Sequence, residues 1–536
     1  MEPSSSTTAE TLLAVDAPSK SYPNPTLPSP TIVLHPRREP FEHGLLPIPK
    51  LIFTDGTLTL TSIKQKILNT ATKPSQITSS VLAEVVDIPI DQAVLVIDTL
   101  VSVLPQLSPQ RTDEDEEGVV DVNDLMLFLY IQSYKRLLTR THKDSATVTD
   151  VWPSTSVFDG VLSTLSPLQL VRSNTRRLMP SQVDEEAHQL SYLNKHIANM
   201  LSLLAESVEG EGDESMVLSL ERFEHLGFLI HFRENGSKRV QLSQISPFFA
   251  NSDPDMPAAP VSITQIHEWL QQNINASLDY ITENISAKEN ITQPVLDVDV
   301  TMSDACNSHV KGPFGSDHAN SRSLTFVEGV SKASVFRHGD DIKGSIVKVS
   351  HCHDSVIYIL APLRYVTVYG CSDTTIVLGA IGKAVRIEHC ERVHIIAACK
   401  RICIANCREC IFYLGVNQRP LILGDNHKLQ VAPYNTFYTQ LNEHMNEVNV
   451  HATINKWNEP LILGMIDPHD SLSHPAGVSD VQAESATCLD PELFTNFLIP
   501  NLLKAESKKP TKENPFSLPE EYNTSLRKQV RHLLFH

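Results

Sequence analysis

The sequence predicts a multidomain protein with a helical N-terminal region, a right-handed parallel β-helix and C-terminal helices. Three observations lead to this fold class. From about 57 to 286 the apolar residues recur with the period of an α-helix. From 341 to 434 the apolar period changes to two, and one short pattern recurs at a nearly constant spacing. Beyond Tyr434 the helical period returns.

The composition limits the classes of function. The chain has 536 residues, enough for roughly three to four domains. Its 44 basic and 63 acidic residues give a net charge of −19, so no overall basic field exists to hold nucleic acid or an anionic membrane. Seven of the nine cysteines lie between 352 and 410, which favours a reducing, intracellular compartment. No apolar run approaches the ~20 residues of a membrane helix, so we expect a cytoplasmic chain with no membrane insertion.

The predicted domains follow these changes in pattern. The first is a Ser-, Thr- and Pro-rich segment that we expect to be a disordered tail, because its prolines remove backbone donors and it has little to bury. In chain order we predict the tail at 1–40, a helical region at 41–290, a linker at 291–309, the β-helix at 310–440 and a C-terminal helical extension at 441–536. The extension includes a Ser-His-Pro-Gly linker at about 468–482.

The helical period is clearest at 183–204, where seven apolar residues follow one another at steps of three or four. One face of that helix must therefore be buried. Similar patterns predict helices over 90–105, 124–139, 216–232 and 262–285, and in the C-terminal extension over 436–448, 489–505 and 517–535.

The repeat at 341–434 predicts the β-helix. Pairs of apolar residues separated by one residue recur at Val347/Val349, Val366/Val368, Val385/Ile387, Ile402/Ile404 and Leu421/Leu423. Three residues after each pair come Cys352, Cys371, Cys390, Cys407 and Asn426, at steps of 19, 19, 17 and 19. Such short repeats leave no room for helical crossovers, so equivalent strands must stack in parallel, coil on coil. We expect the four cysteines and Asn426 to form a structural ladder at one corner of the coils.

Metal binding is the competing interpretation of these cysteines. Cys403, Cys407 and Cys410 have the C-x3-C-x2-C spacing of an iron–sulfur site. In the repeat, however, Cys403 points outward while Cys407 takes the inward corner position, and opposite faces of a strand cannot chelate one ion. We therefore predict no metal and no cofactor. The chain also lacks the usual signatures of nucleotide binding and serine hydrolysis.

The repeat resembles the cofactor-C-like (C-CAP) domain of the tubulin-binding cofactor C family. The matching features are the corner-cysteine coils, the pair Ala398-Cys399, the closing run Val431-Ala432-Pro433-Tyr434 and the stretch 457–463 after the domain. With its helical first half, the whole chain looks like the branch of tubulin-binding-cofactor-C domain-containing proteins that is associated with the centrosome.

The resemblance also allows a test for catalysis. In the GTPase-activating members, a Q-x-R-x-H motif after the Ala-Cys pair supplies an arginine finger, which stabilises charge on the transferred phosphoryl group. Aligned from Ala398-Cys399, this chain has Arg401 in place of the glutamine, Cys403 in place of the arginine and Ala405 in place of the histidine. A cysteine cannot neutralise a phosphate as a guanidinium does, so we predict that the protein is not an enzyme. Arg386 and Arg401 are the weak substitutes, and exposed strand arginines are the commoner interpretation of both.

The resemblance implies a non-catalytic interaction protein that acts at the centrosome, spindle pole or equivalent microtubule-organising centre, in organelle positioning and cell shape. The alternative is a GTPase-activating protein or folding cofactor for tubulin or for an ADP-ribosylation-factor-like small GTPase. Expected partners are tubulin, a small GTPase or centrosomal and spindle-pole proteins, in the cytoplasm and on the cytoskeleton. We expect Arg386, Arg401 and Arg408 to lie on one exposed ladder surface that meets an acidic partner.

Overall fold

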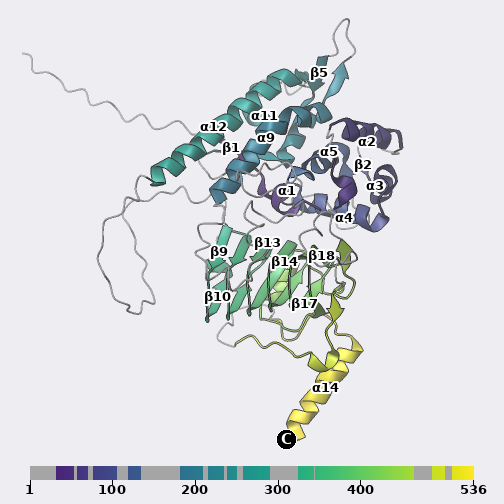
Figure 1. Ribbon diagram of the computed structural model, residues 1–536, viewed down its shortest axis with the longest axis vertical. Helices are drawn as coiled ribbons and strands as arrows, with labels where there is room; N and C mark the ends of the chain where they lie inside the picture. Colours follow the sequence, from purple (N-terminus) through teal and green to yellow (C-terminus); the bar gives the residue numbers. More distant parts are fainter. Residues whose placement is uncertain are drawn as a thin grey trace, which may run out of the picture.

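The computed structural model shows a helical region placed against one side of a β-helix, with a C-terminal helix, α14, projecting from the far end (Figure 1). The structure describes residues 32–46, 48–53, 57–70, 76–105, 119–134, 182–208, 215–234, 238–249, 258–289, 324–342, 344–463, 486–500 and 510–535. The predicted linkers at 291–309 and about 468–482 lie outside these residues.

The predicted helices of the N-terminal region are confirmed in part. The long helix at 183–204 is α9, whose buried face includes Leu190, Leu193 and Leu201. The helices and 3-10 turns of the region are α1 (Arg38–His43), η1 (Pro49–Leu51), α2 (Thr57–Thr70), α3 (Ser79–Val86), α4 (Ile90–Val103), α5 (Val122–Ile131), α9 (Gln182–Leu204), α10 (Leu220–Glu224), η3 (His225–Phe228), α11 (Leu242–Ile245) and α12 (Ile263–Glu289). The side chain of Asp121 caps α5 by accepting from the backbone N–H of Asn123 at 2.7 Å.

Short antiparallel sheets accompany these helices, and the helical period did not predict them. The first contains β1 (Ile32–Pro36), β6 (Ile230–Glu234) and β7 (Lys238–Val240). The others join β2 (Gln76–Ile77) to β3 (Val120–Asp121), and β5 (Ser215–Leu218) to both β4 (Glu206–Val208) and β8 (Val261–Ser262). The predicted helix over 216–232 is therefore wrong, because this stretch is a strand, a short helix, a 3-10 turn and a second strand.

The predicted tail boundary at residue 40 is also wrong. Residues 32–43 form β1 and α1, and β1 pairs with β6 almost 200 positions further along the chain. Arg37, between the two elements, is buried and donates to the carbonyl oxygens of Phe228 at 3.0 Å and Val103 at 2.7 Å. A buried guanidinium needs such acceptors, and here they tie the segment to the helical region.

The β-helix is confirmed. Its strands and 3-10 turn are β9 (Leu324–Glu328), β10 (Ser334–His338), η5 (Gly339–Asp341), β11 (Ile346–Ser350), β12 (Val356–Leu360), β13 (Leu363–Tyr369), β14 (Thr375–Glu388), β15 (His394–Cys399), β16 (Ile402–Ala405), β17 (Ile411–Val416), β18 (Leu421–Leu423), β19 (Gln430–Pro433), β20 (Leu461–Leu463) and β21 (Thr487–Cys488). Every strand pair in this sheet is parallel. Four of the five predicted apolar pairs point into the core and are at most 1 % exposed.

The fifth pair departs from the prediction. In β18 the residue in register with Ile404 is Ile422, so Ile422 points into the core. Leu421 and Leu423 point outward instead and pack against the N-terminal helical region. One extra residue between the strand and the corner shifts the register, and Gly424 takes up the change with a left-handed backbone (φ +68°).

The predicted corner ladder is confirmed. Cys352, Cys371, Cys390 and Cys407 are at most 1 % exposed, and Asn426 takes the same corner in the last coil and accepts from the backbone N–H of Cys407 at 2.9 Å. The residue before each of the four cysteines has a left-handed backbone, which turns the chain sharply: His351, Gly370, His389 and Asn406. Burial, together with the neighbouring thiols, raises the pKa of Cys390 and Cys407 well above its usual range, so these thiols act as packing groups.

The C-terminal extension packs along the coils. It contains α13 (Leu441–Glu447), the 3-10 turn η7 (Pro491–Leu493) and α14 (Glu520–Phe535). The predicted helix over 489–505 is wrong, because the described part, 489–500, contains η7 and otherwise irregular chain. Phe497 and Phe494 in this segment meet outward-facing Tyr358 and Tyr413, at 6.3 and 6.2 Å between ring centroids. Aromatic contacts thus hold the segment on the β12–β17 side of the β-helix.

Close approach between neighbouring coils requires Gly379 in β14. A Cβ atom at this position would lie 2.3 Å from the carbonyl oxygen of Ala361 and 2.7 Å from its nitrogen. Gly379→Ala is therefore expected to lower the free energy of unfolding by about 1–3 kcal/mol, because backbone must shift to make room. Gly339→Ala is the control, since nothing lies within 4 Å of its Cβ position. Urea denaturation of the full chain measures both, and equal effects would contradict the close packing.

Candidate functional site on the ladder face

One sheet of the β-helix, which we call the ladder face, carries the predicted site. It consists of β9, β11, β13, the second half of β14, β16, β18 and β20. Strand register aligns one outward residue from each coil in a single row: Phe326, Lys348, Thr367, Arg386, Cys403, Leu421 and Leu461. In Figure 1 the N-terminal helices lie along the side of the β-helix that carries β9, β13 and β18.

Cys403, at the finger position of the resemblance, lies in this row between Arg386 and Leu421. Its side chain is partly buried and contacts the hydrophobic core of the helical region. Burial raises the pKa of the Cys403 thiol to about 12, so the thiol is neutral at pH 7. Cys407 and Cys410 are fully buried inside the β-helix, which confirms that the three cysteines do not converge. Among the described residues, no group of three or more His, Cys, Asp or Glu side chains is placed to hold a metal ion.

Arg386 is buried, at 6 % exposure, so its predicted position as an exposed strand residue is wrong. Its Nε lies 2.5 Å from Oε1 of Glu388 in the same strand, and its Nη1 donates to the backbone carbonyl oxygen of Glu42 in α1. The guanidinium is therefore held by the helical region rather than presented to solvent. An outside partner cannot reach it in this arrangement.

Arg401 is likewise 6 % exposed, where the sequence predicted an exposed arginine. Its Nη1 donates to the hydroxyl oxygen of Thr99 in α4 at 2.6 Å, and its Nε donates to Gln418 at 2.8 Å. Its Nη2 lies 3.9 Å from Oδ2 of Asp98, to which Gln418 also donates at 2.9 Å. Burial lowers the pKa of Arg401 and raises that of Asp98, so each charge needs the other here.

An aromatic contact completes the polar half of this interface. The hydroxyl of Tyr365 in β13 donates to the carbonyl oxygen of Ser102 at 2.8 Å. The ring of His43 stacks on Tyr365 with centroids 4.3 Å apart and an interplanar angle of 10°. Burial lowers the pKa of His43 to about 4, so the imidazole is neutral at pH 7 and stacks as an uncharged ring.

The apolar half of the interface lies at the other end of the row. Ala405, Leu421, Leu423 and Leu463 point outward from the β-helix but are at most 5 % exposed, because they belong to the same hydrophobic cluster as the core of the helical region. Helix and ladder residues are thus packed as one body there. Sequence reasoning missed this contact, since it placed Leu421 and Leu423 inside the last coil.

Arg408, the third arginine of the predicted partner-binding set, does not lie on the ladder face. It follows the corner cysteine Cys407, and its backbone forms isolated parallel β-bridges with Glu391 and His427 in the neighbouring coils. Its side chain is 65 % exposed and lies 3.9 Å from Asp425. The three arginines therefore do not form one surface, and only Arg408 among them is accessible.

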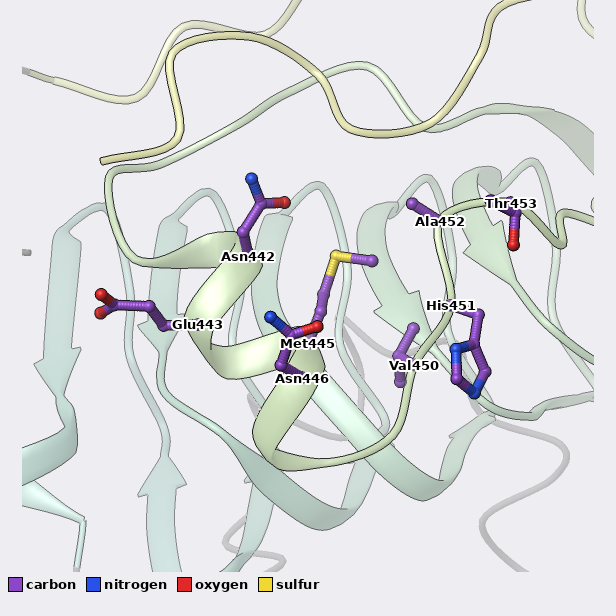
Figure 2. A pocket seen from close by; sticks show the side chains of 8 residues that line it. All are labelled: Asn442, Glu443, Met445, Asn446, Val450, His451, Ala452 and Thr453. Atoms are coloured by element: carbon purple, nitrogen blue, oxygen red, sulfur yellow. The ribbon is translucent and has the colours of Figure 1, made fainter. Parts of the chain in front are cut away.

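A separate hollow of about 420 Å³ lies beside α13. Figure 2 shows its lining: Asn442, Glu443, Met445, Asn446, Val450, His451, Ala452 and Thr453. Glu443 and His451, the two ionisable side chains of this lining, lie at opposite ends of the hollow. They cannot act on the same reacting atom, so we assign the hollow no catalytic role.

Comparison with known proteins identifies the β-helix. Residues 344–461 match the family model described as Tubulin binding cofactor C. This stretch is a tubulin-binding-cofactor-C domain. The match begins before β11 and ends within β20, so the cofactor-C domain extends beyond the boundary at 440 that the repeat predicted.

Similarity to curated proteins extends beyond the cofactor-C domain. The protein from Bos taurus named TBCC domain-containing protein 1 is 25% identical over 417 residues, which cover 76% of this chain and 68% of that protein. The Homo sapiens protein of the same name is 26% identical over 354 residues, 64% of this chain and 60% of its own length. The Mus musculus protein is 25% identical over 435 residues, 78% and 72% of the two chains. Similarity over such lengths includes much of the helical region as well as the cofactor-C domain.

The described residues contain no helix that is long and apolar enough to cross a membrane. The chain as a whole has a net charge of −19, but several cations gather at the ladder face of the cofactor-C domain and its edge. Lys348 and Arg386 lie on this face, Arg401 and Arg419 lie at its edge just before β16 and β18, and each of the four contacts the helical region.

Proposed function

We propose that this protein is a non-catalytic interaction protein of the microtubule cytoskeleton, which uses its cofactor-C domain and helical region as one scaffold. Family membership supports protein partners, and the family's description makes tubulin the first candidate. Action at the centrosome, spindle pole or an equivalent organising centre, in the cytoplasm, follows as a proposal from the branch that the whole chain resembles.

The non-catalytic part of the proposal rests on the side chains at and around the finger position of the ladder face. Cys403 stands where an arginine finger would, and its neutral thiol offers no positive charge to a phosphoryl group. The two substitute arginines already donate hydrogen bonds within the chain. Arg386 donates to Glu388 and to the backbone of Glu42, and Arg401 donates to Thr99 and Gln418. A finger must enter a partner's active site, and these side chains are buried within their own chain.

The purified full chain is therefore expected to bind tubulin without accelerating GTP hydrolysis by tubulin or by an ADP-ribosylation-factor-like GTPase. An arginine finger is worth ~10³–10⁵ in rate, so its presence would be obvious in a phosphate-release assay. Co-elution with tubulin in gel filtration measures the binding. Acceleration that disappears in Arg386→Ala or Arg401→Ala would replace this proposal with a GTPase-activating function, and failure to bind tubulin would remove tubulin as the partner.

A further inference from the structure

The ladder face concentrates positive charge in an acidic chain. Lys348, Arg386, Arg401 and Arg419 line its contact with the helical region, while the chain as a whole has a net charge of −19. Lys383, at the same side, has its pKa lowered to about 8 by burial and then by neighbouring cations, Lys400 first among them. Cations gathered along one contact in this way attract carboxylates.

The helical region supplies the carboxylates. Asp91 of α4 lies 3.2 Å from Arg419, and Asp98 of the same helix lies 3.9 Å from Arg401. On the other side of the face, Glu185 of α9 lies 3.9 Å from Lys348. Three acidic side chains from two helices thus meet three cations from three different coils. The two surfaces are complementary in charge over the length of the contact.

The ion pairs lie at the edge of the contact rather than at its centre. The side chains of Asp91, Asp98 and Glu185 are 63%, 33% and 21% exposed. Exposed ion pairs contribute little individually. Leu421, Leu423 and Leu463 also pack against the helical region, so a competing acidic partner has to match the ion pairs and offset this apolar contact as well. The helical region keeps its place because it is part of the same chain, which gives it a high effective concentration at the face.

We propose that the N-terminal helical region is an autoinhibitory lid, whose acidic side chains occupy the basic ladder face in place of an acidic protein partner. Such a partner binds the face only when the lid is released. The inference goes beyond the scaffold function and does not depend on tubulin, since any partner with a carboxylate-rich surface would compete in the same way.

Cys403 provides a built-in probe, because it lies under the lid within the row. Alkylation of the full chain with iodoacetamide, followed by peptide mass spectrometry, reports each cysteine separately. Exposed Cys488 is the reference for an accessible thiol, and Cys390 in the core reports unfolding of the β-helix. In the wild type we expect Cys403 to react at least about tenfold more slowly than Cys488, and Cys390 to stay unmodified.

Two combined variants test the lid and the ladder face separately. The lid variant Asp91→Asn/Asp98→Asn/Glu185→Gln removes the carboxylates, and the face variant Lys348→Ala/Arg401→Ala/Arg419→Ala removes the cations. Both are expected to speed alkylation of Cys403 by at least tenfold, which corresponds to weakening the docking by about 1.4 kcal/mol or more, and the face variant by the larger factor because it includes Arg401→Ala. Arg408→Ala changes an exposed arginine away from the contact and is expected to change nothing.

Binding of a fluorescent oligoglutamate peptide, followed by polarisation, then distinguishes the two sets. The lid variant is expected to bind this acidic probe about tenfold more tightly than the wild type, whereas the face variant loses binding although its lid is at least as loose. The proposal is overturned if wild-type Cys403 reacts as fast as Cys488, if the lid variant leaves alkylation and peptide binding unchanged, or if the face variant still binds the peptide. Alkylation of Cys390 together with Cys403 in the lid variant would also overturn it, since the two regions would then unfold as one unit.

Discussion

Val366→Asp is expected to lower the free energy of unfolding of the β-helix by about 3–5 kcal/mol. Val366 is fully buried in β13, where it stacks between Val347 and Val385 of the neighbouring coils. A carboxylate there has no hydrogen-bond donor or cation within the apolar column, so it must either remain unpaired or take up a proton. Either outcome costs much of the stability of a typical domain.

Thr367→Asp is the matched control, one residue further along the same strand. Thr367 points outward and lies in register between Lys348 and Arg386, so a carboxylate at this position meets two cations. Its effect is expected to stay within about 1 kcal/mol. Thermal and urea denaturation of the full chain, followed by circular dichroism, compare the variants. Similar losses for both would show that the alternation of inward and outward residues in β13 has been misread.

Arg401→Ala is expected to be the most damaging change at the contact between helical region and ladder face, at about 2–3 kcal/mol. The substitution removes the donors to Thr99 and Gln418 and leaves the partly buried carboxylate of Asp98 without its cation. The loss is expected at the lower end for a buried ion pair because the Asp98 side chain is 33% exposed and can recruit water.

Arg408→Ala is the matched control for Arg401→Ala. Arg408 is an arginine of the same domain, but its side chain is 65 % exposed and its nearest carboxylate, on Asp425, is 3.9 Å away. We expect a change within about 0.5 kcal/mol. Urea denaturation gives the difference, and hydrogen exchange of the α4 backbone near Ser102 shows whether the loss occurs at the contact. A cost for Arg401→Ala no larger than for Arg408→Ala would mean that the contact contributes nothing to stability.

The repeat pattern predicted the β-helix well because its signal is local. In a strand, successive side chains point to opposite faces, so an apolar pair separated by one residue identifies the inward positions without knowledge of the rest of the chain. The corner cysteines, fully buried as predicted, follow from the same spacing. The prediction failed in the last coil, where Ile422 rather than Leu421 and Leu423 points inward. Three consecutive aliphatic residues fit either register, and the period alone cannot choose between them.

In the N-terminal region, the sequence predicted the long helices but not a strand whose pairing partner is distant in the chain. The α9 and α12 helices are long and periodic, and their sequences predicted them. The strand β1 has no such signal, because its partner β6 lies far along the chain and pairs Ile32 with Glu234. A strand of five residues is specified largely by what pairs with it and what packs on it.

The sequence by itself determined the coil period, the corner ladder and the absence of an arginine at the finger position. It also placed Arg386 and Arg401 on the outside of the β-helix, which is correct with respect to the coils. Only the tertiary structure decided that this outside is covered, since the exposure of an outward residue depends on what packs across from it. Asp98 and Glu42, which lie in separate helices far from the repeat, have no pattern that links them to these arginines. The folded chain brings them together because the ladder face supplies cations and apolar side chains that the helical region can bury.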